Sequence, residues 1–150
     1  MRWASLALPI FLGSISCSGP SPEDALVNAV HRVRDARTHS VEVIIVIGEG
    51  SCLACSGQLI RMIEERNGLP GLVVVNFAST AVLDVSGVIS SPAYLDGDEL
   101  GIEGAEFRTK SRVILVRNGL VERYLEVRSP DMEKITNDLS EMLLELEGSS

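Results

Sequence analysis

The 150-residue sequence predicts an α/β fold with a central mixed sheet of four or five strands and helices on both of its sides. Two runs rich in β-branched residues, 41–47 and 72–78, have the composition of strands that are buried on both faces. A helical pattern separates them, which predicts a parallel pair with a right-handed crossover. Further along, the strand-like segments 112–116 and 120–127 flank Arg117-Asn118-Gly119, a strong hairpin signal.

The N-terminal residues indicate export. Residues 4–15 follow a short positive start and are mostly apolar, but they are too few for a stable transmembrane helix of about 20 residues. We assign residues 1–16 to a signal peptide, and 17–21 to a lipid-attachment residue with a short linker. The segment 13–18 resembles the lipobox of bacterial lipoproteins, which implies that Cys17 becomes the lipidated first residue of the mature chain. Ordinary signal cleavage nearby, with Cys17 lost or left free, is the alternative.

The number of cysteines and the net charge indicate which classes of function are compatible with this sequence. Three cysteines in an exported chain leave one odd thiol, whereas lipid on Cys17 would leave the even pair Cys52 and Cys55. Export also places this pair outside the reducing cytosol, where a disulfide persists. The formal net charge of −8 argues against nucleic-acid binding and against charge-driven adhesion to anionic lipid.

The globular domain is expected over residues 22–147, with a helix near each end. Ser21-Pro22 and Ser129-Pro130-Asp131 both have the composition of a helix start. His31, in the first helix, and His39, in the turn before the first strand, are expected to be ordinary surface residues.

Residues 79–107 are the least regular part of the pattern. The stretch 81–89 fits either a helix or a short strand. The stretch 91–104 combines prolines and glycines with several acids, which is the composition of a solvated loop. Its acids do not alternate closely enough for a calcium loop.

The residues most suited to a chemical reaction are two cysteines in the segment Ser51-Cys52-Leu53-Ala54-Cys55, where the first strand pattern ends and a helical pattern begins. Ser51 is a candidate N-cap, which places Cys52 in the first turn, where N–H groups and the helix dipole favour a thiolate. Cys55, one turn later and more shielded, can close a disulfide with Cys52. This arrangement predicts dithiol redox chemistry. A structural disulfide or half of a zinc site are the alternatives, although zinc needs about four ligands.

This order of elements resembles the thioredoxin fold, and more closely the membrane-anchored thioredoxin-like proteins of the bacterial cell envelope. The resemblance covers residues 22–147 and rests on Cys52-Leu53-Ala54-Cys55 after a buried strand, and on the strand and turn 113–119. It implies that Cys52 attacks and that Cys55 resolves the mixed disulfide. It also implies a substrate groove bordered by Ser51, Lys110 and Ser111.

The same resemblance implies a thiol–disulfide oxidoreductase without a cofactor or a resident metal. Its substrates would be protein or small-molecule thiols and disulfides, and a separate redox partner would exchange electrons with it. The protein would be lipid-anchored in the cell envelope, facing the periplasm or the exterior.

Several positions depart from the family pattern. Ser111 stands where the family has a cis-proline, so the peptide bond before it is expected to be trans. Val46 replaces an acid that many thioredoxins bury, and Ser51 replaces a frequent aromatic residue. Leu53-Ala54 adds no positive charge and Glu49 opposes a thiolate, which argues against a strongly oxidising pair.

Two other functions stay open from the sequence. Soft thiolates suit Cu(I), so a thioredoxin-fold protein that binds copper or another soft metal is one alternative. The other alternative is a non-catalytic adaptor protein, in which the disulfide only stabilises the start of a helix. The absence of a cis-proline keeps this alternative open.

Overall fold

The computed structural model describes residues 19–34, 39–79, 86–102 and 105–150. The predicted signal peptide 1–16 and the predicted lipid-attachment residue Cys17 lie outside these ranges. No helix within them is long and apolar enough to cross a bilayer. The elements follow one another as α1 (Pro22–Arg34), β1 (Val41–Ile47), α2 (Leu53–Glu64), β2 (Leu72–Asn76), α3 (Ser86–Ile89), β3 (Tyr94–Asp96), η1 (Gly97–Leu100), α4 (Ala105–Thr109), β4 (Arg112–Arg117), β5 (Leu120–Glu126), η2 (Ser129–Asp131) and α5 (Met132–Gly148).

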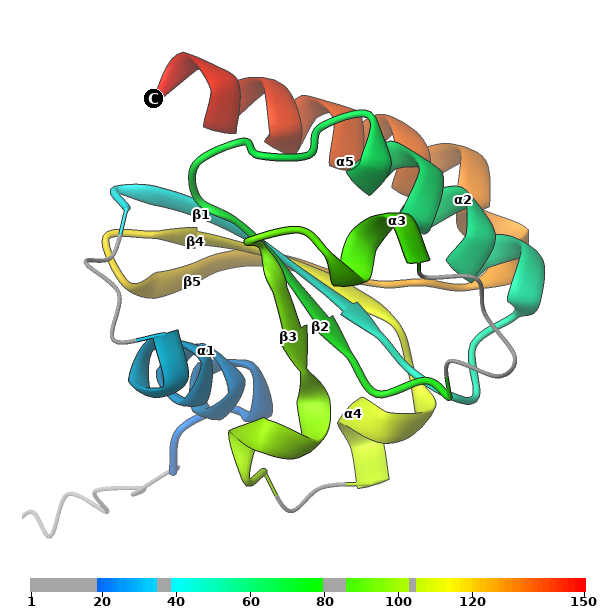
Figure 1. The fold of residues 1–150 in the computed structure, drawn as a ribbon, viewed down its shortest axis with the longest axis horizontal. Coiled ribbons are helices and arrows are strands. Elements are labelled where there is room, and N and C mark those ends of the chain that lie inside the picture. The colour runs from blue at the N-terminus through cyan, green and yellow to red at the C-terminus, as the bar shows by residue number, and fades with distance from the viewer. Residues whose placement is uncertain (1–18, 35–38, 80–85, 103–104) are drawn as a thin grey trace, which may run out of the picture.

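The strands form one five-stranded mixed sheet in the order β3-β2-β1-β4-β5 (Figure 1). β2 runs parallel to both β1 and β3, whereas β4 runs antiparallel to both β1 and β5. The predicted crossover unit and the predicted hairpin are both confirmed. The α/β fold class is therefore confirmed, and the arrangement is consistent with a thioredoxin-like fold.

Helices cover both faces of the sheet, as the sequence predicted. The helices α2, α3 and α5 lie on one face, and α1, η1 and α4 lie on the other (Figure 1). Successive residues of a strand point to opposite faces, so Ile45 and Ile47 join the core under α2 and α5, while Ile44 and Val46 join the core under α1. All seven residues of β1 are buried, which explains why the sequence is apolar there at every position except Glu42.

The strand β3 and the helix η1 lie within the stretch 91–104, so the expectation of a solvated loop there was wrong for residues 94–100. The strand β3 pairs with β2 through Val74 and Tyr94, and its three residues are half-buried or exposed. Gly97 follows it directly, and a Cβ atom there would lie 2.3 Å from the ring of Phe77. A strand of this length has too few residues to show an alternation that a sequence pattern could reveal.

The helix α1 is tied to the sheet by a pair that the sequence pattern did not indicate. His31 Nε2 lies 2.7 Å from Glu42 Oε2, and the Glu42 side chain is 3% exposed. A buried carboxylate needs a partner of this kind because its desolvation is otherwise costly. The expectation that His31 is merely solvated was therefore wrong, whereas His39 is exposed as expected.

A buried ion pair holds the beginning of α1. Arg112, at the start of β4, is 3% exposed, and its guanidinium bonds Glu23 of α1. The same guanidinium lies 2.6 Å from Glu106 and 5.1 Å from the ring centroid of Phe107. Arg112 thus joins α1, β4 and α4, at the end of the sheet from which the Cys-x-x-Cys loop also leaves.

Candidate functional site

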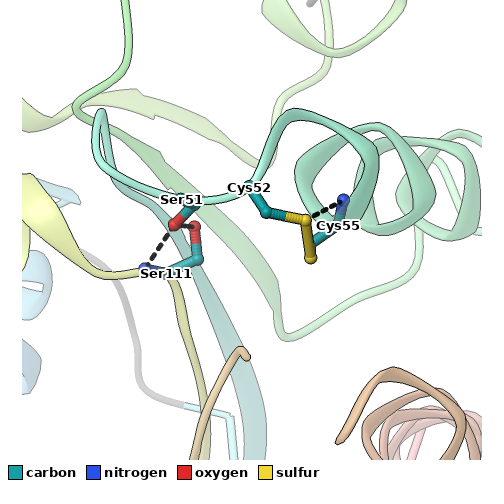
Figure 2. The surroundings of a disulfide bond; sticks show 4 residues. All are labelled: Ser51, Cys52, Cys55 and Ser111. Carbon is teal, nitrogen blue, oxygen red and sulfur yellow. Dashed lines mark hydrogen bonds between the residues drawn. A yellow bond between two sulfur atoms is a disulfide. The ribbon is translucent and has the colours of Figure 1, made fainter. Parts of the chain in front are cut away.

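Cys52 and Cys55 form a disulfide at the beginning of α2, with 2.06 Å between the two sulfur atoms (Figure 2). The short loop from Gly48 connects this position to the end of β1. Cys55 is 3% exposed and belongs to the core under α2, while Cys52 is only partly buried. Cys55 is therefore the more buried residue of the pair, as the sequence predicted.

The helix α2 begins at Leu53, and its N-cap is Cys52 rather than Ser51. The amide N–H of Cys55 donates to Cys52 Sγ at 3.1 Å. A hydrogen bond of this kind stabilises a sulfur anion more than a neutral thiol. The expectation of a Ser51 cap was wrong because the Ser51 side chain turns away from the helix.

Ser51 bonds Ser111, which lies 60 positions along the chain. The Ser111 amide N–H donates to Ser51 Oγ at 2.8 Å, and the Ser51 hydroxyl donates to Ser111 Oγ at 2.5 Å. The Gly48 amide N–H also donates to Ser111 Oγ, at 3.0 Å. Figure 2 shows the two serine side chains facing one another beside the cysteine pair. We call these hydrogen bonds among Gly48, Ser51 and Ser111 the serine clasp.

Ser111 is buried beside the loop that carries Cys52. All peptide bonds of the described residues are trans, so the expectation for the bond before Ser111 is confirmed. Ser111 is 0% exposed, its N–H is used by Ser51, and its C=O accepts from the Val127 amide N–H at 2.9 Å. Both backbone groups of Ser111 are therefore already bonded within the domain.

Lys110 lies at the surface next to this buried serine. Its Nζ is 3.4 Å from Glu126 Oε2 on the neighbouring strand β5. The pKa of the Glu126 carboxyl is lowered, first by its hydrogen bond from Arg128 and then by the charges of Arg128 and Lys110. Of the three residues expected along the groove, Lys110 is exposed, Ser51 is half-buried and Ser111 is buried.

A depression of about 230 Å³ lies beside the loop, and sequence reasoning did not predict it. It sits at the carboxyl ends of the parallel strands β1, β2 and β3, where open α/β sheets commonly bind ligands. One lining residue, Asn76, is buried, and its side chain bonds both the Ala78 backbone and, at 3.4 Å, the Tyr94 hydroxyl. The lining residues are Glu49, Asn76, Phe77, Ala78, Ser79, Tyr94, Asp96 and Asp98.

Histidines are not gathered around the cysteine pair. His31 contacts Glu42 on the α1 face of the sheet, opposite to the core that contains Cys55. Within the described ranges, no group of three or more His, Cys, Asp or Glu side chains is placed to hold a metal ion.

Comparison with known proteins finds no family model, no curated protein and no solved structure that matches this chain. What the protein does must therefore follow from the chemistry of Cys52, Cys55 and the residues around them.

Proposed function

We propose that the protein is a thiol–disulfide oxidoreductase that works through Cys52 and Cys55. The unequal environment of the two sulfur atoms carries this proposal. Cys52 is partly exposed at the start of a helix, and its Sγ accepts a hydrogen bond from the Cys55 amide N–H. Cys55, in contrast, is buried in the core. Two-step exchange needs one accessible sulfur that forms a bond with the substrate, and one shielded sulfur that later breaks that bond.

In the reducing direction, the Cys52 thiolate attacks one sulfur of a substrate disulfide. A mixed disulfide forms, and the other substrate sulfur leaves as a thiolate that takes up a proton. Cys55 then loses its proton and attacks Cys52 Sγ, which releases the second substrate thiol and restores the Cys52–Cys55 bond. An external dithiol must return two electrons to the pair before the next cycle. The oxidising direction is the reverse of these steps, with protein or small-molecule thiols as substrates.

A redox-equilibrium titration of the mature chain in glutathione and dithiothreitol buffers tests the proposal. We expect a reversible two-electron transition of the pair between about −270 and −120 mV, the range of thioredoxin-like catalysts. Mass spectrometry after acid quenching and alkylation gives the oxidised fraction at each potential. A pair that stays oxidised below about −300 mV would instead be a structural disulfide, as in the adaptor alternative.

We further propose that Cys17 carries lipid and holds the domain at a membrane of the cell envelope. The lipobox-like segment and the odd cysteine count support this proposal. Residues 17–21 reach at most about 18 Å when fully extended, so the domain would remain close to the bilayer surface.

Mass spectrometry of protein extracted from membranes is expected to detect an acylated Cys17 peptide at the mature N-terminus. A Cys17→Ser variant should lose this modification and leave the membrane fraction. Detection of a soluble, unmodified mature chain that begins at another residue would contradict the proposal.

A further inference from the structure

The loop that carries Cys52 is fastened to the segment that leads into β4. The Glu49 amide N–H donates to the Arg108 C=O at 2.6 Å. The serine clasp adds three hydrogen bonds, from the Gly48 amide, the Ser51 hydroxyl and the Ser111 amide. Ser111 is 0% exposed; its hydrogen bond from the Gly48 amide is buried, and its two hydrogen bonds with Ser51 are partly buried. Burial strengthens such contacts relative to contacts that are open to water.

Glycine permits the close approach of the two segments. A Cβ atom on Gly48 would lie 2.7 Å from the backbone nitrogen of Lys110, and one on Gly50 would lie 2.5 Å from the backbone oxygen of Thr109. Carbon atoms do not approach rigid backbone so closely, so a side chain at either position would push the segments apart. The residue types at 48 and 50 therefore match a loop that is pressed against its neighbour.

Cys52 directly follows Ser51, so the serine clasp fixes the backbone from which the Cys52 side chain leaves. The sulfur benefits from the Cys55 amide only while it stays near the 3.1 Å separation seen in the structure. When the disulfide opens, Cys52 loses its covalent tie to Cys55. Its neighbour Leu53 is 59% exposed and adds little packing, so the clasp remains as a restraint on the loop.

We propose that Ser51 and Ser111 are positioning residues that hold Cys52 Sγ at the start of α2 in the reduced protein. In this way they set the reactivity of the Cys52 thiolate and the redox equilibrium of the pair. The inference rests on the proposed function, because it concerns regulation of the same site. Both serines act through Cys52, and neither exchanges bonds with the substrate.

The variants Ser51→Ala and Ser111→Ala test this role against the control Ser56→Ala. Ser56 lies in α2 and is equally a buried serine, but its Oγ has no hydrogen-bond partner among the described residues. Two quantities are measured on the mature chain: the pH midpoint of Cys52 alkylation in the reduced protein, and the equilibrium of the pair with glutathione.

Both clasp variants are expected to raise the alkylation midpoint by up to about one pH unit, because one hydrogen bond that supports the anion is worth roughly that much. Their glutathione equilibrium should shift up to about tenfold towards the disulfide, or about 30 mV towards a more reducing potential, because the reduced form loses stability. Ser56→Ala should leave both quantities unchanged. The variant Ser51→Thr keeps a hydroxyl at this position, so its alkylation midpoint and its glutathione equilibrium should match those of the parent protein.

The proposal is overturned if the clasp variants change thermal stability but match Ser56→Ala in midpoint and equilibrium. If Ser111→Ala does not fold, Ser51→Ala decides alone, because Ser51 is only half-buried. A failure of the proposed function has a different signature, since the parent pair itself would then not exchange with glutathione. The alkylation midpoints of chemically reduced protein would still decide whether the serines position Cys52.

Discussion

Replacement of Cys52 by serine is expected to abolish thiol–disulfide exchange, whereas replacement of Cys55 should stop the reaction at the mixed disulfide. The reason is the difference in accessibility, because Cys55 is 3% exposed while Cys52 is partly exposed and receives an amide N–H. After incubation with glutathione disulfide, Cys55→Ser should carry a glutathione adduct on Cys52, and Cys52→Ser should stay largely unmodified. Intact-mass analysis and peptide mapping read out both results.

Partial alkylation of the reduced parent protein provides the matching control. At neutral pH, and with Cys17 replaced by serine so that it does not compete, label should accumulate first on Cys52. Equal labelling of both thiols would contradict the difference in reactivity. Preferential labelling of Cys55, or faster formation of an adduct at Cys55 in the Cys52→Ser variant, would show that the two roles are reversed.

Replacement of Arg112 by alanine is expected to lower the free energy of unfolding by about 3–5 kcal/mol. The change removes the partner of Glu23, whose side chain is 9% exposed, and leaves a buried carboxylate without its counter-charge. It also removes the contact of the guanidinium with the ring of Phe107. Urea denaturation, followed by circular dichroism, measures the difference from the parent.

Two further variants separate the lost charge pair from lost packing. Arg117→Ala removes an arginine that also contacts two carboxylates, Glu122 and Glu145, but at the surface, so its effect should be small. The double variant Arg112→Met with Glu23→Leu removes the buried charges together and should recover much of the loss. If Arg112→Ala is no worse than Arg117→Ala, the buried pair does not stabilise the domain.

Local patterns in the sequence determined the class of the fold and the position of the cysteine pair. A strand buried on both faces needs a nearly continuous apolar run, and 41–47 and 72–76 show one, with Glu42 and Asn76 as their only polar residues. The turn Arg117-Asn118-Gly119 is equally local, and Asn118 and Gly119 both have the positive φ that such a hairpin requires. The spacing of Cys52 and Cys55 on one helical turn likewise depends only on helix geometry.

Only the tertiary structure decided which polar side chains are buried and which residues they contact. Ser51 forms a hydrogen bond with Ser111, and His31 contacts the carboxylate of Glu42. Arg112 pairs with Glu23, which lies 89 positions away in the sequence. A polar residue in a helix or loop looks like a surface residue in any local window. Its burial depends on a partner that the pairing of β1 with β4, or the packing of α1 on the sheet, brings to it. For the same reason the sequence placed Ser51 at a helix cap, while the folded chain uses it to fasten the loop before Cys52.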